Sequence, residues 1–144
     1  MTLRVVLSRK LEKAIDAADL LTELSQESEA VFLSDRRSIA AAERALFLCI
    51  ESMVDACELT LRLSGQRIGS HAKATVERAA AEGLIEASAA EQLMDLITFR
   101  NRLSHDYELI RPREVFAQLQ PAAQLFTRLG AHFRDWVKSL PKDS

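Results

Sequence analysis

The sequence predicts an all-α protein, an up-and-down bundle of four long helices plus one short helix that forms a single domain over residues 1–144. Glycine and proline, which interrupt helices, account for only four and three of the 144 residues. Hydrophobic residues make up 48% of the chain and recur every three or four positions, the spacing of an amphipathic helix. A chain of this length and hydrophobicity can bury a core without metals or disulfides.

The first two long helices are expected over residues 3–25 and 34–63. The second begins at Ser34 and Asp35, two residue types that favour the N-cap position. It carries two apolar rows, so we expect it to lie at the centre of the bundle or to be shared with a partner. The apolar stripe of the first helix comprises Leu7, Leu11, Ala14, Ala18 and Leu21.

The short helix is expected over residues 70–81, with Gly83 as the C′ residue just beyond its end. The third long helix is expected to begin with Ser88 as its N-cap, because Glu91 stands three residues later and would complete a capping box. It is expected to end between residues 103 and 107. This end of the third long helix is where the sequence concentrates its reactive side chains.

The last helix is expected to begin at Pro112, because proline suits the first turn of a helix. Pro121 lies inside the same helix and predicts a kink there. The apolar stripe of this helix continues to within a few residues of the end of the sequence. It comprises Leu119, Ala122, Phe126, Leu129, Phe133, Trp136 and Leu140.

The formal net charge is −2, from 19 basic and 21 acidic residues. A protein that binds nucleic acid over a large area usually carries a basic excess, so any contact with nucleic acid here has to be local. No apolar run is long enough to span a membrane, and the first residues lead directly into a charged amphipathic stretch without a signal peptide. We therefore expect a cytoplasmic protein with no membrane contact.

Cys49 and Cys57 lie eight residues apart on one predicted helix, a rise of ~12 Å. That separation is too long for a disulfide, so both are expected to be buried thiols in a reducing compartment. The three histidines, His71, His105 and His132, are scattered, and no Cys or His pair has the spacing of metal ligands. We expect no metal and no cofactor.

Five reactive side chains stand within eight residues near the end of the third long helix. They are Arg100, Asn101, Arg102, His105 and Tyr107. On an unbroken helix Arg100 and His105 project about 140° apart, so they cannot both face one substrate. Either the helix loosens at His105, or two copies of the chain meet and share the site.

These residue types suit the cleavage of a phosphodiester. A histidine exchanges protons near neutral pH, and an arginine can hold a phosphate and neutralise charge in the transition state. RNA carries its own nucleophile, the 2′-hydroxyl, so its cleavage needs a base, an acid and a cation but no metal. Two histidines from two subunits could supply the base and the acid.

Arg100, His105 and Tyr107 form an R-x4-H-x-Y pattern. The run Phe-Arg-Asn-Arg-Leu-Ser-His-Asp-Tyr over residues 99–107 is similar to the FRNxLxHxY run of HepT-like HEPN toxins. Upstream pieces resemble the second helix of that family and the run that precedes its motif helix, so the resemblance covers residues 35–107 together with the helical layout. R-x4-H alone is common by chance, and the flanking residues make the pattern more specific.

The resemblance implies a metal-independent endoribonuclease and a homodimer in which the two motifs face each other. It implies Arg100 and His105 as catalytic residues and Asn101 as a polar helper. It also implies a cognate antitoxin, a small nucleotidyltransferase that adenylylates Tyr107. Arg102 occupies a variable position of the family motif, so a substrate-binding role for it rests on geometry alone. The Ile-Arg-Pro run after the motif departs from the Ile-Asp pair that the family more often shows.

A second hypothesis is a non-catalytic helical binding partner of a nucleotidyltransferase that uses the bundle only for docking. The near-neutral charge favours a protein partner, whereas the presence of Arg, His and Tyr together favours the enzyme. The individual side chains also have structural alternatives. These are His105 as a helix C-cap, Tyr107 as an amphipathic anchor, and Arg100 and Arg102 as surface ion-pair partners of Asp95, Asp106 or Glu108.

Four further residues are expected to have no catalytic role. Glu43 and Arg44, on the second long helix, are expected to be helix-surface or interface residues rather than catalysts. His71 and His132 are expected to be surface or packing residues and are assigned no function.

Overall fold

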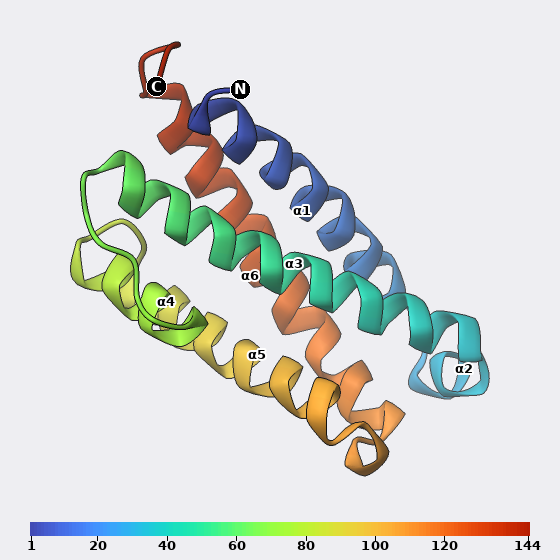
Figure 1. The fold of residues 1–144 in the computed structure, drawn as a ribbon. Coiled ribbons are helices and arrows are strands. Elements are labelled where there is room, and N and C mark those ends of the chain that lie inside the picture. Colours follow the sequence, from blue (N-terminus) through green and yellow to red (C-terminus); the bar gives the residue numbers. More distant parts are fainter.

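The computed structural model describes all residues from 1 to 144 and consists of helices without any strand (Figure 1). The all-α prediction is therefore confirmed. The elements are α1 (Leu3–Ser25), α2 (Glu29–Ser34), α3 (Arg36–Leu63), α4 (Ala72–Ala81), α5 (Ala87–His105), the 3-10 turn η1 (Tyr107–Leu109) and α6 (Pro112–Lys138).

Helix α3 is the central element of the bundle, because it packs against α1, α6, α4 and α5. The apolar rows of this helix predicted such a central position. The two chain ends meet at one end of the bundle, where the backbone N–H of Arg4 donates to the carbonyl of Ser144 at 3.2 Å (Figure 1). The short helix α2 and the turn from α5 to α6 lie at the other end (Figure 1). The predicted site segment belongs to that second end.

Several helix ends lie where the sequence predicts them. Helix α1 has the predicted bounds, and α3 begins directly after Asp35, whose carboxylate accepts from the N–H of Arg37 at 2.9 Å. This hydrogen bond holds the pKa of Asp35 below its ordinary value. Helix α4 ends two residues before Gly83, which adopts a φ of +73° as expected of a C′ glycine. Helix α6 begins at Pro112 and continues without a break through Pro121.

The structure departs from the predicted local structure at three places. The six-residue helix α2 is not predicted by the sequence; it is capped by Ser28 and attached to the bundle by the fully buried ring of Phe32. Ser88 does not cap α5, because Ile85 is buried and the chain becomes helical two residues later, at Ala87. The short helix begins at Ala72 rather than residue 70, with the His71 ring accepting from the N–H of Ala74 at 3.2 Å. His71 is therefore an N-cap.

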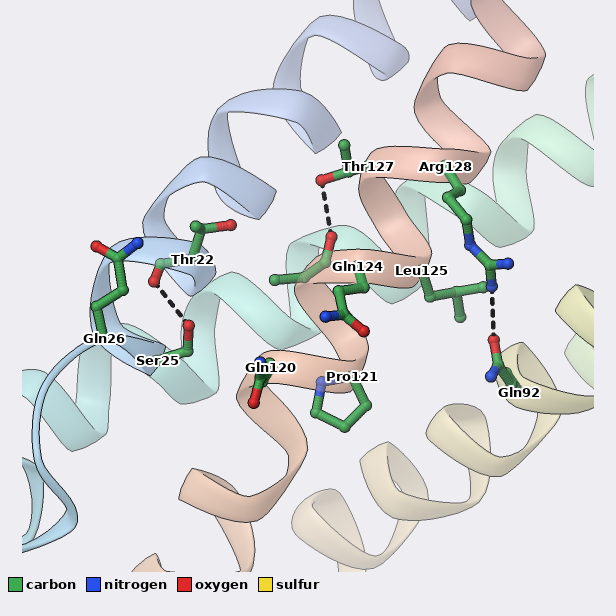
Figure 2. Close-up of a pocket in the computed structure, with 11 residues that line it drawn as sticks. Thr22, Ser25, Gln26, Gln92, Gln120, Pro121, Gln124, Leu125, Thr127 and Arg128 are labelled. Atoms are coloured by element: carbon green, nitrogen blue, oxygen red, sulfur yellow. Dashed lines mark hydrogen bonds between the residues drawn. The ribbon is translucent and has the colours of Figure 1, made fainter.

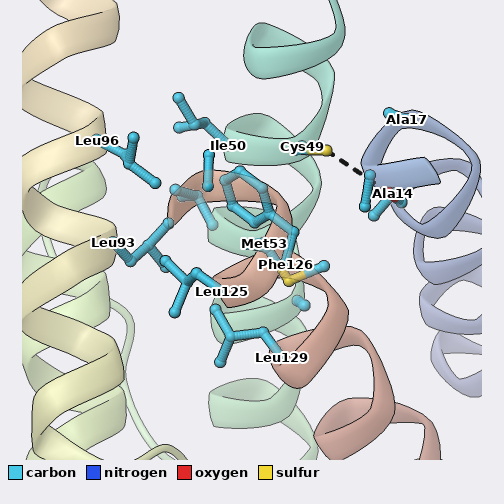
Figure 3. Packing of buried hydrophobic residues seen from close by; sticks show 14 of the residues in the cluster. Ala14, Ala17, Cys49, Ile50, Met53, Leu93, Leu96, Leu125, Phe126 and Leu129 are labelled. Atoms are coloured by element: carbon cyan, nitrogen blue, oxygen red, sulfur yellow. Dashed lines mark hydrogen bonds between the residues drawn. The ribbon is translucent and has the colours of Figure 1, made fainter. Parts of the chain in front are cut away.

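The buried hydrophobic residues form one cluster of 37, shared among the helices. In Figure 3, Leu93 of α5, Ile50 and Met53 of α3, and Phe126 of α6 meet inside it. Cys49 and Cys57 are buried and unpaired, and burial raises the pKa of both thiols to about 12, so they stay protonated. None of the helices has the length and hydrophobicity needed to cross a membrane.

Candidate functional site

The motif segment begins on a regular helix and leaves it at a defined point. Helix α5 continues to His105, and the N–H of Asp106 closes the last turn on the carbonyl of Arg102 at 2.7 Å. Asp106 then has φ −124° and ψ 37°, which ends the helix, and the chain enters the 3-10 turn that starts at Tyr107. The helix ends within the predicted interval. Tyr107 therefore lies just beyond the end of α5, seven residues after Arg100.

Arg100 is held by two hydrogen bonds. Its guanidinium forms an ion pair with Glu51 of α3 through Nη1, and its Nη2 donates to Oδ1 of Asn101 at 2.9 Å. Only 16% of the Arg100 side chain is exposed. The sequence suggested Asp95, Asp106 or Glu108 as its carboxylate partner, and that expectation is wrong, because the bundle brings α3 against α5 and supplies Glu51 instead.

Arg100 lines a cavity of about 350 Å³ between α3 and α5. Leu103 and Ser104 of α5 and Tyr107 of η1 complete one wall. The opposite wall comes from α3 and comprises Ala40, Glu43, Arg44, Leu46, Phe47 and Ile50. Arg100 and Tyr107, two of the predicted site residues, thus share one cavity.

The α3 wall contains Glu43 and Arg44, which the sequence predicted to be helix-surface or interface residues. The Arg44 guanidinium lies 5.9 Å from the centroid of the Phe47 ring and belongs to none of the five ion pairs. Desolvation by burial raises the pKa of Glu43, which lies beside Arg44 in the cavity wall. Arg44 is therefore the cavity's cation without a carboxylate partner. The three-residue spacing of Arg44 and Phe47 is the one sequence signal of their shared face.

Arg102 and His105 lie outside this cavity. Arg102 donates to Glu114 of α6 at 3.1 Å, again not to the acidic residues that the sequence suggested. His105 is exposed and its ring forms no hydrogen bond within the chain. The other two histidines do form one, His71 as the cap of α4 and His132 with the carbonyl of Leu84. His105 is thus the one histidine with both ring nitrogens available to a ligand.

The largest cavity, about 750 Å³, lies elsewhere, between α1 and α6 with Gln92 of α5 at its edge (Figure 2). Its wall is rich in amides and hydroxyls, including Gln26, Gln120 and Gln124, and Arg128 donates to Gln92 at 2.9 Å. These groups do not exchange protons near neutral pH, and none of the predicted site residues is among them. The cavity between α3 and α5 is therefore the better candidate for chemistry.

Two exposed aromatic side chains line the smaller cavity, and a third exposed apolar residue, Leu109, follows two positions after Tyr107. Phe47 is 39% exposed, Tyr107 60% and Leu109 73%, the last two on η1. Isolated exposed apolar residues are ordinary, but several around one cavity mark a surface that binds something. The end of the bundle that carries the motif thus combines cations, an available imidazole and apolar surface.

Comparison with known proteins supports the resemblance on which the motif was identified. The family model described as "Ribonuclease HepT-like" matches residues 14–128, most of the chain. Among curated proteins, none matches the chain in sequence.

Solved structures share the fold at low sequence identity. A toxin–antitoxin complex with AMP-PNP contains a chain with a TM-score of 0.79 and 16% identity, covering 90% of this chain and 98% of that one. A tri-AMPylated HEPN toxin of Shewanella oneidensis, in complex with an MNT antitoxin, has a TM-score of 0.76 and 16% identity, covering 94% and 98%. YutE, a cytosolic protein of unknown function from Bacillus subtilis, has a TM-score of 0.74 and 16% identity, covering 91% and 90%.

Proposed function

The chain belongs to the HepT-like ribonuclease family, and we propose that it is a toxin-type, metal-independent endoribonuclease that cleaves RNA at a homodimer interface. The observation that carries the proposal is the placement of Arg100, fixed by two hydrogen bonds at the wall of the α3–α5 cavity. An arginine held in this way can neutralise a phosphate without reorganising during the reaction.

The proposed reaction uses the 2′-hydroxyl of the RNA as nucleophile. A base removes the hydroxyl proton while the oxygen attacks the adjacent phosphorus, and an acid protonates the departing 5′-oxygen. His105 has both ring nitrogens free for such proton transfers. Arg100 balances the negative charge that builds on the phosphate oxygens, and Asn101 keeps one edge of that guanidinium in place.

We infer the homodimer from the position of His105 relative to the cavity. Within one chain Arg100 faces the cavity, whereas His105 is outside it. A second copy that covers the exposed apolar residues Phe47 and Leu109 would bring its own His105 toward the cavity. The base and the acid would then be the two copies of His105, related by a two-fold axis.

The proposed partner is a nucleotidyltransferase antitoxin that adenylylates Tyr107. The exposed side chain of Tyr107 is accessible to a second protein and lines the same cavity as Arg100. A phosphate attached to its hydroxyl would bring negative charge to the wall where Arg100 lies, and it would compete with RNA for that cation. Two of the structural neighbours are toxin–antitoxin complexes, one of them with an AMPylated toxin.

Arg102 is the proposed contact for RNA outside the cavity. Its ion pair with Glu114 is half exposed, so it stabilises the fold little and can exchange for a phosphate contact. One such contact is compatible with the near-neutral charge of the chain, because the proposed RNA interface is small.

The test is RNA cleavage by the purified chain, compared with the variants Arg100→Ala and His105→Ala. We expect the wild type to cleave RNA in the presence of a chelator and both variants to be folded but at least a hundredfold slower. A wild-type protein that binds a nucleotidyltransferase tightly but never cleaves RNA would instead support the second candidate, a non-catalytic partner, which the net charge of −2 favours.

A further inference from the structure

We propose that Glu51 is a positioning residue for RNA cleavage, one that aims the guanidinium of Arg100 into the α3–α5 cavity. Glu51 stands 49 positions before Arg100 in the sequence and reaches it only because α3 packs against α5. This inference rests on the proposed function, since it gives Glu51 a role that acts through a catalytic Arg100.

Arg100 has the least exposed basic side chain among the five ion pairs. Only 16% of the Arg100 side chain is exposed, whereas in each of the other four ion pairs at least 39% of the basic side chain is exposed. A guanidinium withdrawn from water needs a carboxylate partner to remain there. Without Glu51, the stable position of the Arg100 head group is out in solvent, away from the cavity wall.

Most N–H donors of Arg100 stay free although the side chain has two partners. A guanidinium carries five N–H groups. Glu51 occupies one on Nη1 and Asn101 occupies one on Nη2. Three N–H groups remain, enough for a two-point contact with a phosphate. The ion pair therefore orients Arg100 without using up its capacity to bind substrate.

Glu51 contacts Arg100 from outside the α3–α5 cavity. Glu51 does not line the α3–α5 cavity, although its neighbour Ile50 does. It lines a separate surface groove together with Lys10 and Asp55. The carboxylate thus holds Arg100 from the side and leaves the cavity open, which is the geometry of a positioning contact rather than of a block.

The experiment uses the full-length chain and compares Glu51→Ala, Glu51→Gln and the control Asp55→Ala. Asp55 is a close match, because it lies one turn further along α3, pairs with Lys10 at 2.9 Å and has a similar exposure, 36% against 41%. It does not touch Arg100. Steady-state cleavage of RNA gives kcat and KM separately, and thermal melts report the fold.

We expect Glu51→Ala to lower kcat by roughly tenfold to a hundredfold, the usual cost of a misplaced catalytic group, with KM changed less than threefold and the protein folded. Glu51→Gln keeps an acceptor of the same reach, so its kcat should lie between those of Glu51→Ala and the wild type. Asp55→Ala should cleave RNA as the wild type does. In an Arg100→Ala background, Glu51→Ala should cause no further loss, because its effect passes through Arg100.

Four results would overturn the inference. A Glu51→Ala protein as active as the wild type, or more active, would mean that the carboxylate does not position Arg100. An equal loss in Asp55→Ala would assign the effect to the fold, and a Glu51→Gln protein no better than Glu51→Ala would remove the role of the acceptor. Additive losses in the double variant would separate Glu51 from Arg100.

The inference and the proposed function fail in different ways. Cleavage that Arg100→Ala abolishes and Glu51→Ala preserves overturns the inference alone. A wild-type protein that cleaves no RNA overturns the proposed function and the inference with it.

Discussion

Replacing Arg100 by alanine separates a catalytic role from a structural one most clearly, because the two roles predict effects of very different size. The substitution removes the ion pair with Glu51 and the hydrogen bond to Asn101. Exposed ion pairs contribute up to about 1 kcal/mol, and breaking a fully buried one costs about 3–5 kcal/mol. Glu51 is 41% exposed, so it regains water when its partner is lost.

We therefore expect Arg100→Ala to lower the free energy of unfolding by about 1–2 kcal/mol, which lowers Tm by roughly 2–8 °C in a chain of this size. A domain of ordinary stability, about 5–15 kcal/mol, stays almost fully folded after such a loss. Loss of one charged contact to the transition state costs about 3 kcal/mol, or more than a hundredfold in rate. Unfolding therefore cannot account for the expected fall in activity.

The assay is cleavage of a labelled RNA under single-turnover conditions, with a thermal melt of the same preparation. The matched control is Arg62→Ala, which removes an exposed pair with Glu58 and should change neither the rate nor Tm appreciably. A folded Arg100→Ala protein whose rate lies within threefold of the wild type would refute the assignment of Arg100. A fall in Tm large enough to unfold the protein at the assay temperature would refute the structural estimate.

Four further predictions concern the substrate, the partner, the metal and the second copy. Arg44→Ala should raise KM for RNA roughly tenfold with little change in kcat. Arg44 is a cation of the cavity wall without a carboxylate partner, and we expect it to bind the ground state and the transition state equally. An unchanged KM would exclude it from the substrate site. Tyr107→Phe should keep most of the cleavage activity and gain no nucleotide mass on co-expression with a cognate nucleotidyltransferase, as measured on the intact protein. A Phe variant that gains as much mass as the wild type would place the modification elsewhere. Cleavage should persist in EDTA, since the sequence offers no ligand set, and activity that is lost in the chelator and restored by a divalent ion would contradict the proposed chemistry. Phe47→Asp should convert the dimer to a monomer in light scattering, because it puts a charge on the exposed apolar surface; a wild-type protein that is monomeric at micromolar concentration would already disprove the shared site.

The long helices could be predicted from the sequence because each carries local signals that agree with the final packing. Helix α1 has a regular apolar stripe, and Asp35 caps α3 as its residue type suggests. Helix α2 has only six residues, too few for a recognisable apolar period. It depends on a tertiary contact between Phe32 and Phe116, whose ring centroids lie 5.0 Å apart. At the start of α5 the burial of Ile85 overrides the capping preference of Ser88. The capping and periodicity signals of the sequence therefore fail at helix ends whose position is decided by tertiary packing.

The residues of the candidate site likewise fall into those that the local sequence identifies and those that only the packing of the bundle brings together. The motif locates Arg100, His105 and Tyr107, since these residues lie within one short segment. The α3 residues that complete the cavity and hold Arg100, namely Arg44 and Glu51, lie about fifty positions earlier, and which face of α3 meets α5 is decided by the packing of the whole bundle. Their residue types alone are equally consistent with an ordinary solvated helix surface.

Two routes could reconcile Arg100 with His105: a helix that loosens at the histidine, or a site shared by two copies. In the structure α5 is regular from Arg100 through His105, so the two side chains keep the angular separation of about 140° that a helix imposes. The helix ends one residue too late to redirect His105. Leu103, Ser104 and Tyr107 follow Arg100 by three, four and seven positions, the spacing of one helix face, and all of them line the cavity. The face of α5 that carries Arg100 therefore accounts for the position of the proposed modification site but not for that of the proposed base. In a single chain, Arg100, the proposed phosphate-binding residue, has no imidazole on its own face of α5, and the proposed cleavage consequently requires the histidine of a second copy.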